Sequence, residues 1–234
     1  MSPLAKPLLF RGAPIRLTAT SVEFGQAPKS GLAFFPGAAP LPLRIKTMRE
    51  TNPAVTLLSF RLPRTTSPGH YDGKVELGGS EMPIKIEVQA RPQMKFYPPW
   101  LSLTAHPDER LEINVSALNQ GNVKVPIERK STFCLLEPRG VDVAIYHALT
   151  EEPPPDQRRF DRAAEGIAES HGGLVRATVR EGAGDLAPGE FRELLVELHF
   201  SDRVKPRRTY YGAWFLGESG LGIQVEGTKP PEGI

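Results

Sequence analysis

The stretch Pro68-Gly69-His70-Tyr71-Asp72-Gly73-Lys74-Val75-Glu76-Leu77-Gly78 decides the fold, because its pattern returns near the end of the chain as Pro206-Arg207-Arg208-Thr209-Tyr210-Tyr211-Gly212-Ala213-Trp214-Phe215-Leu216-Gly217. When Tyr71 is aligned with Tyr210, Leu77 falls on Leu216 and Gly78 on Gly217. A repeat of this kind indicates two copies of one structural unit.

Each copy predicts a β-hairpin. Apolar and polar residues alternate, a short glycine-containing turn follows, and a second alternating stretch covers residues 84–88 or 223–226. This pattern is typical of two antiparallel strands that bury one face. Tyr71 and Tyr210 each follow a proline-marked corner. Immunoglobulin-like sandwiches place at this corner a tyrosine whose hydroxyl bonds to the backbone, so we interpret both residues as structural corner tyrosines.

Earlier stretches fit the same architecture. In these stretches apolar residues alternate with polar ones, and Gly, Pro or Asn residues separate one stretch from the next. This pattern predicts strands that bury their apolar side and expose the other to solvent. These positions are Ile15, Leu17, Ala19, Leu41, Leu43, Ile45, Thr56, Leu58, Phe60, Leu111, Ile113, Val115, Ala117, Leu194, Val196, Leu198 and Phe200. The sequence therefore predicts an all-β protein of two tandem immunoglobulin-like antiparallel β-sandwiches.

The segment from Leu111 to Val123 contains an alternating strand and the turn Asn119-Gln120-Gly121-Asn122. This strand and turn resemble those of bacterial immunoglobulin-like adhesion and cell-wall modules. The Pro-Gly-x-Tyr-x-Gly-x-Val segment at Pro68 resembles the penultimate strand of the same superfamily. The resemblance implies a fold, and sandwiches of this kind serve many unrelated functions.

We expect a first domain over residues 1–92 and a second over 93–234, with a helical insertion at about 138–173. One helical face of the insertion carries Phe160, Ala163, Ala164, Ile167 and Ala168. Asp156 is the expected N-cap of this helix, and a second, shorter helix is expected over 141–149. We interpret the insertion as a cover on one end or edge of the second sheet, and a partner-binding arm stays open as the alternative.

The composition excludes several classes of protein. A chain of 234 residues with 39% hydrophobic and 24% charged residues is globular and long enough for two small domains. No apolar run approaches the ~18 residues of a membrane span, so we do not expect a membrane-embedded protein. The first ten residues show no export signal. We expect a cytoplasmic location, or a periplasmic or extracellular one if the chain is a processed form.

The charge is unevenly distributed. Residues 1–92 carry 12 Lys and Arg against 6 Asp and Glu, whereas residues 93–234 carry 17 against 21. The basic half has no run of Lys or Arg interleaved with aromatic residues, so nucleic acid is not an expected partner.

The residue patterns predict no enzyme, no cofactor and no metal site. The five histidines are scattered without the spacing of metal ligands. The turn at Ser219 lacks the second glycine and the strand-to-helix context of a nucleophile elbow. Cys134, the single cysteine, is expected to be a small buried hydrophobe in a strand.

Aromatic residues are the better candidates for a binding site. Strand alternation places Tyr211 and Phe215 on the face opposite to Tyr210 and Trp214, so one pair points away from the core. Outward aromatic side chains are typical of interfaces. The candidate partner-binding residues are Tyr97, Trp100, Tyr211 and Phe215.

These features favour a non-catalytic interaction protein, acting as a structural or accessory subunit of a larger assembly. A carbohydrate-binding module that stacks sugars on Tyr97, Trp100 or Tyr211 is one alternative. The two modules also resemble periplasmic pilus chaperones, which consist of two immunoglobulin-like modules of similar total length, and that is the second alternative.

Overall fold

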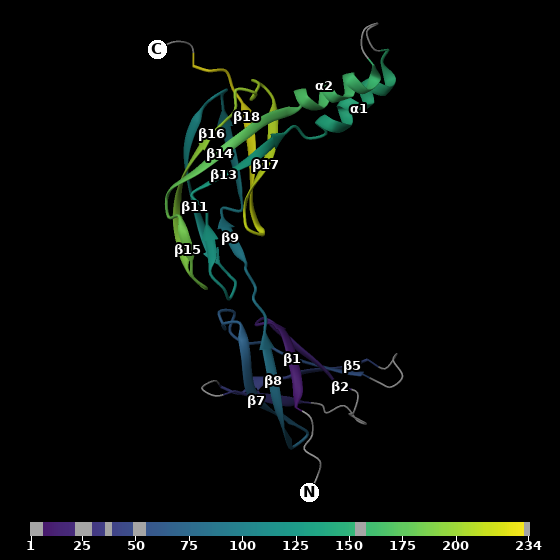
Figure 1. Ribbon diagram of the computed structural model, residues 1–234, viewed down its shortest axis with the longest axis vertical. Coiled ribbons are helices and arrows are strands. Elements are labelled where there is room, and N and C mark those ends of the chain that lie inside the picture. The colour runs from purple at the N-terminus through teal and green to yellow at the C-terminus, as the bar shows by residue number, and fades with distance from the viewer. Residues whose placement is uncertain (1–6, 22–29, 36–38, 49–54, 153–157, 232–234) are drawn as a thin grey trace. The chain divides into compact units, whose positions relative to one another are not determined.

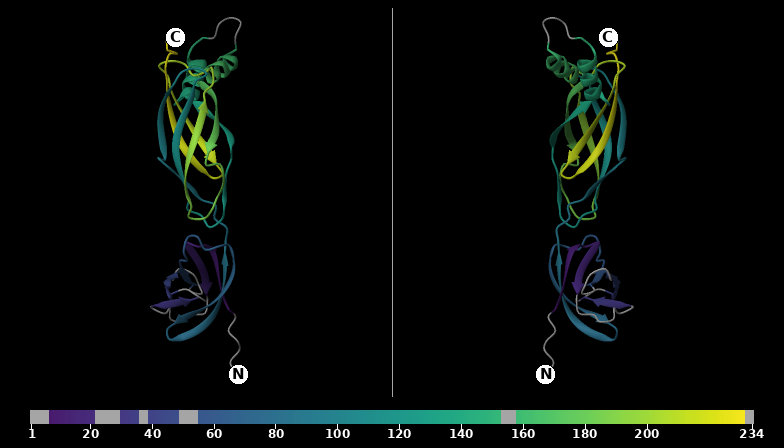
Figure 2. Two further views of the ribbon diagram at one scale, coloured as in Figure 1. Left: turned by 90° about the vertical axis from the view of Figure 1, so that its left-hand side faces the viewer. Right: turned by 90° about the vertical axis from the view of Figure 1, so that its right-hand side faces the viewer.

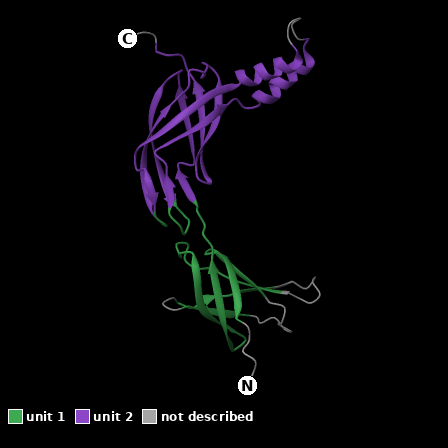
Figure 3. Ribbon diagram, in the orientation of Figure 1, with its two compact units in different colours: residues 1–93, 119–124, 187–189 green, residues 94–118, 125–186, 190–234 purple. Residues whose placement is uncertain are grey.

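The computed structural model describes the chain except residues 1–6, 22–29, 36–38, 49–54, 153–157 and 232–234. The chain forms two compact units (Figure 3). The first contains residues 1–93, 119–124 and 187–189, and the second contains the remainder. These units differ from the expected domains 1–92 and 93–234 mainly in two loop segments, which belong to the first unit.

The first unit is one continuous eight-stranded sheet that folds into two layers (Figure 1). Its strands are β1 (Leu8–Ala13), β2 (Arg16–Ser21), β3 (Gly31–Phe34), β4 (Leu41–Pro42), β5 (Arg44–Met48), β6 (Val55–Phe60), β7 (Gly69–Leu77) and β8 (Ser80–Val88). Their spatial order is β4-β3-β7-β8-β1-β2-β6-β5. Apart from the parallel pair β1–β8, the paired strands are antiparallel.

Strand β1 joins the two layers of the first unit. Its residues 8–12 pair in parallel with β8, and its residues 11–13 pair antiparallel with β2. The groups β1-β2-β6-β5 and β3-β7-β8 reproduce the strand order of the two sheets of an immunoglobulin-like sandwich. Between the layers lie the buried residues Phe10, Leu17, Ala19, Ala33, Leu43, Leu58, Phe60, Val75, Leu77, Ile84, Ile86 and Val88.

The second unit repeats this plan with longer strands. They are β9 (Met94–Tyr97), β10 (Trp100–Ala105), β11 (Arg110–Asn119), β13 (Lys130–Leu136), β14 (His171–Glu181), β16 (Phe191–His199), β17 (Thr209–Leu216) and β18 (Ser219–Gly227). Their order is β10-β18-β17-β13-β14-β16-β11-β9, and β10 pairs in parallel with β18. Strands β12 (Val125–Ile127) and β15 (Gly184–Leu186) form a separate pair.

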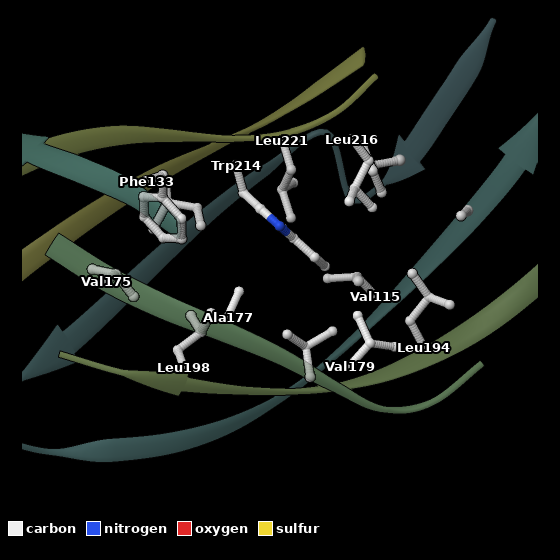
Figure 4. Packing of buried hydrophobic residues seen from close by; sticks show 14 of the residues in the cluster. Val115, Phe133, Val175, Ala177, Val179, Leu194, Leu198, Trp214, Leu216 and Leu221 are labelled. Carbon is white, nitrogen blue, oxygen red and sulfur yellow. The ribbon is translucent and has the colours of Figure 1, made fainter. Parts of the chain in front are cut away.

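Strand β14 links the two layers of the second unit. It pairs with β13 through residues 171–178 and with β16 through residues 176–181. Trp214 lies at the centre of the core, among side chains from both layers (Figure 4). Its indole Nε1 donates a hydrogen bond of 2.6 Å to the hydroxyl of Ser131, which satisfies the one polar atom of this fully buried ring.

The helical insertion is a short helix pair between β13 and β14. Helix α1 covers Gly140–Thr150 and helix α2 covers Arg159–Glu169. They extend from the end of the second unit at which β13 ends and β14 begins (Figures 1 and 2). Arg158 occupies the N-cap of α2, and the expected cap Asp156 lies outside the described residues. Neither described helix has the length and hydrophobicity needed to span a membrane.

The expected packing of this insertion on the sheet is not what the structure shows. Helix α2, all of whose residues are described, has no buried side chain. Its apolar face, which the sequence suggested would cover the sheet, is exposed: Phe160 is 81% accessible to solvent and Ile167 is 36% accessible. The amphipathic pattern was correct, but its apolar side does not face the sandwich.

The turn at residues 119–122 carries two buried asparagines. Asn119 holds the turn itself, because its Oδ1 accepts from the Gly121 N–H at 2.8 Å and its Nδ2 donates to the Val123 carbonyl at 2.8 Å. Asn122 binds other parts of the first unit. Its Oδ1 accepts from the Arg91 N–H at 2.7 Å, and its Nδ2 donates to the carbonyls of Thr66 and Gln89 at 2.9 and 3.0 Å.

Candidate functional site

Alternation along β17 separates its aromatic residues into two sets. Tyr210 and Trp214 are completely buried in the core of the second unit. Tyr211 and Phe215 lie on the opposite side of the strand, with 38% and 62% of their surfaces exposed. The outer side of β17 therefore presents two aromatic rings to solvent.

Trp100 extends this surface across the neighbouring strands. It lies on β10 opposite Gly222 of β18, which in turn pairs with Ala213 of β17. The six-membered ring of Trp100 occupies the space that a side chain at Gly222 would need. Trp100 is 45% exposed, and its ring centroid lies 5.9 Å from that of Tyr211 at an interplanar angle of 44°. Glycine at 222 thus allows the indole to lie across the sheet.

Two leucines extend the same surface to β13 and β14. Leu136 is the partner of Tyr211 in the ladder between β13 and β17, and Leu174 is the partner of Cys134 in the ladder between β13 and β14. Both leucines are exposed. We call the five residues Trp100, Leu136, Leu174, Tyr211 and Phe215 the outer aromatic face.

Sequence reasoning missed both leucines, and it placed Cys134 wrongly in the core. Cys134 is exposed. Phe133 and Leu135 are the buried residues of β13, so alternation turns Cys134 and Leu136 outward. The same alternation was visible in the sequence and could have identified Leu136.

Tyr97 is not part of the outer aromatic face. It lies on β9, at the end of the strand order opposite to β10, and Lys95 Nζ lies 5.3 Å from the centroid of its ring. Tyr97 is joined to Pro98 by a cis peptide bond. Of the four candidate residues, the structure brings together Trp100 and Tyr211 in contact and places Phe215 on the same face of the sheet.

The two corner tyrosines differ in environment. The Tyr71 hydroxyl donates to the Ser67 carbonyl at 2.8 Å, and the ring is partly exposed. The Tyr210 hydroxyl accepts a hydrogen bond of 3.1 Å from the Lys205 N–H, and the residue is completely buried. Burial raises the pKa of Tyr210, because the charged phenolate would be poorly solvated there.

A polar cavity of about 650 Å³ lies where the helix pair meets the sandwich of the second unit. Arg208 and Glu137 form an ion pair of 2.6 Å at its wall. The Ser170 hydroxyl lines the same cavity and donates a hydrogen bond to the Ile167 carbonyl at 2.8 Å.

Ser219 lies outside this cavity, at the start of β18. Its hydroxyl accepts a hydrogen bond from the Met94 N–H at 3.0 Å and so supports the beginning of that strand. Among the described residues, no cluster of His, Cys, Asp or Glu could hold a metal ion.

Helix α1 is tied to α2 by a charged network on the wall of this cavity. Glu151 accepts a hydrogen bond from His147 and forms an ion pair with Arg162 of α2. The hydrogen bond from His147 is the main cause that holds the pKa of Glu151 below its ordinary value. This arrangement joins the two helices.

No protein-family model and no curated protein matches this chain. Solved structures of low similarity include a protein of unknown function from Porphyromonas gingivalis W83, with a TM-score of 0.28, 11% identity, and coverage of 94% of this chain and 96% of that one. They also include the Clostridium thermocellum CbhA fibronectin(III)-like modules (TM-score 0.24, 13% identity, coverage 97% and 92%). The titin Ig tandem domains A164–A165 match with a TM-score of 0.26 and 7% identity, over 97% of this chain and 96% of that one. Similarity at this level carries no argument, so the immunoglobulin-like assignment rests on the strand order.

Proposed function

We propose that this protein is a non-catalytic interaction module that binds another protein through the outer aromatic face, as an accessory subunit of a larger assembly. The observation that carries this proposal is the exposure of Trp100, Tyr211 and Phe215 on one side of a regular sheet. A monomer gains nothing from large exposed aromatic rings on adjacent strands, whereas contiguous exposed apolar patches are typical of interfaces.

The geometry of the face suits a protein partner. Paired strands hold the rings, so little backbone freedom is lost when a partner binds. Aromatic residues are enriched among the few interface residues that carry most of the binding energy. Leu136 and Leu174 add aliphatic surface beside the rings, as expected for the apolar centre of an interface with a more polar rim.

Carbohydrate binding remains the second candidate because Trp100 offers a broad, accessible ring. The ring of Tyr211 is inclined to it by 44°. Two rings at this angle do not form one flat platform for a flat stack of sugar rings. A protein surface, which can follow the angle between two rings, is the better fit.

The pilus-chaperone alternative has less support from the strand pairing. That class uses strand addition, in which an edge strand pairs with a segment of the bound subunit. Here β8 is paired on both sides, with β7 and β1, and β18 is paired with β17 and β10. The last strand of each repeated hairpin is therefore occupied within its own unit.

Affinity purification from the native host tests the proposal. Tagged wild-type protein is compared with the double variant Tyr211→Ala/Phe215→Ala and with the control Phe191→Ala, which removes an exposed aromatic ring on β16. A partner retained by wild type and control but lost by the double variant supports the proposal. Binding of the wild type to a glycan array, lost in Trp100→Ala, would favour carbohydrate recognition instead.

A further inference from the structure

The two layers of the first unit differ in charge. The described carboxylates of residues 1–92 all lie on β7 or β8, and they are Asp72, Glu76, Glu81 and Glu87. No described residue of the layer β1-β2-β6-β5 is acidic. The outer side of this layer instead carries exposed cations on β1, β2 and β5 and directly after β6. We call them the basic sheet face: Arg11, Arg16, Arg44, Lys46 and Arg61.

The charge of the basic sheet face is poorly neutralised within the unit. Among the described residues, Arg11 is the one member with an ion pair, at 2.8 Å to Glu87 of β8. Arg16 and Arg61 each adjoin one member of a buried pair in the ladder between β2 and β6, so the antiparallel register brings them side by side. Like charges at opposite positions destabilise a strand pair. An anionic partner would relieve this repulsion.

The same layer ends in a strand with a free edge. In the strand order of the first unit β5 is the last strand, and it pairs with β6 alone among the described strands. An edge strand presents backbone N–H and carbonyl groups that can pair with another extended chain. Ile45 packs against the core, so alternation places Arg44 and Lys46 on the outer side of β5. A chain that pairs with β5 would therefore bring every second side chain beside these two cations.

The chemistry of this edge favours an acidic polypeptide. An extended polypeptide can continue the backbone ladder of β5, and its carboxylates would complement Arg44 and Lys46. A second copy of β5 would bring the same two cations, and like charges oppose that pairing. The aromatic residues of this layer, Phe10 and Phe60, are buried, so its described outer side has no ring on which nucleic-acid bases could stack.

We propose that the free edge of β5 binds an extended acidic segment of a partner protein, which adds a strand to this layer. Carboxylates at every second position of the segment would lie beside Arg44 and Lys46. Apolar residues at the intervening positions would lie on the side of Ile45. This site is in the first unit and the outer aromatic face is in the second, so either proposal can fail without the other.

Fluorescence anisotropy with labelled nine-residue peptides tests this proposal on the full chain. In the first peptide Glu alternates with Val, and in the second Lys alternates with Val. The third keeps the glutamates of the first but has Pro at two central Val positions, which removes the N–H groups needed for strand pairing. We expect the Glu–Val peptide to bind at least about tenfold more tightly than either of the others.

Matched variants locate the binding. Arg44→Ser/Lys46→Ser should weaken binding of the Glu–Val peptide at least about tenfold, with a cooperative thermal transition confirming that the unit remains folded. The control Lys74→Ser/Lys85→Ser removes two exposed cations from β7 and β8, so it changes the net charge equally and should leave the affinity unchanged. The charge swap Arg44→Glu/Lys46→Glu should reverse the preference, so that the Lys–Val peptide binds more tightly than the Glu–Val peptide.

Three kinds of result would overturn the proposal. The first is equal binding of the Glu–Val peptide and either of the other two peptides, or an equal loss in Lys74→Ser/Lys85→Ser. The second is a concentration-dependent dimer in sedimentation velocity that Arg44→Ser/Lys46→Ser abolishes, because a second copy would then occupy the edge. The third is tighter binding of a thymidine oligonucleotide than of the Glu–Val peptide, because the basic sheet face would then recognise phosphate chains.

Discussion

The six-membered ring of Trp100 lies against the backbone of Gly222 on the neighbouring strand, in the position that a side chain at residue 222 would occupy. This contact holds the indole across β18 and brings it to Tyr211 of β17. The outer aromatic face therefore depends on a residue without a side chain.

Gly222→Val should displace the Trp100 ring while the sheet persists, because valine favours strands but its branched side chain needs the space that the indole fills. The chain has two tryptophans, and Trp214 is fully buried. Acrylamide quenching should therefore report Trp100 alone, with a clear increase in its accessibility in the variant. Unchanged quenching would contradict the described position of the ring.

Tyr210→Phe should lower the free energy of unfolding by about 0.5–1.5 kcal/mol, because the buried tyrosine loses its partly buried hydrogen bond from the Lys205 N–H. Tyr71→Phe should lower the free energy of unfolding by less than Tyr210→Phe does, because the hydrogen bond from Tyr71 to Ser67 is exposed to water. Urea unfolding of the two variants measures both values. Equal losses, or a larger loss for Tyr71→Phe, would contradict this difference in environment.

The buried phenol of Tyr210 also predicts a dependence on alkaline pH. Burial raises its pKa in the folded state above the ordinary value of 10.0. The neutral form is therefore favoured by folding, so this contribution to stability is complete below about pH 10 and is lost as the pH rises through the folded pKa. Between pH 9 and pH 11.5, the melting temperature of the wild type should fall more steeply than that of Tyr210→Phe.

Glu151 predicts the opposite dependence at acidic pH for the helix pair. Its pKa is lowered from 4.5, chiefly by the hydrogen bond from His147, so its carboxylate form is favoured in the folded state. The contribution is present above pH 4.5 and is lost as the pH falls through the folded pKa. Circular dichroism at 222 nm should show a partial loss of helix in the wild type as the pH falls through the folded pKa of Glu151. Glu151→Gln should have reduced helix content already at neutral pH.

Asn122→Ala should destabilise the first unit by about 2 kcal/mol or more, because Arg91, Thr66 and Gln89 lose hydrogen-bond partners in a buried site.

A cut after residue 92 should give two fragments that each unfold cooperatively. The fragment 1–92 lacks Asn122 and should therefore be less stable than the same unit in the whole chain. Absence of a cooperative transition in both fragments would contradict the division into two folding units.

Strand alternation explains why much of this structure could be predicted. The repeated hairpins containing Tyr71 and Tyr210 have a period of two in their apolar residues, and that period places Trp214 and Phe215 on opposite faces without knowledge of other strands. In the structure Trp214 is the buried member and Phe215 the exposed one. The exposure of Leu136 and Cys134 follows from the same period, although the general tendency of cysteine to be buried suggested otherwise.

Relations between distant segments could not be predicted. The position of Trp100 over Gly222 depends on the parallel pairing of β10 with β18, which no local pattern encodes. The amphipathic pattern of α2 identifies its apolar side, but it does not tell whether that side packs within the chain. The inclusion of residues 119–124 in the first unit depends on Asn122, whose partners lie 31 to 56 positions earlier in the sequence.

The most direct test of the outer aromatic face combines thermal unfolding with partner binding for Tyr211→Ala/Phe215→Ala. Because both side chains lie outside the core, we expect a melting temperature within about 3 °C of wild type. We expect affinity for the partner retained by the wild type to fall at least about tenfold. A large loss of melting temperature, or a partner affinity equal to that of the wild type, would contradict the account.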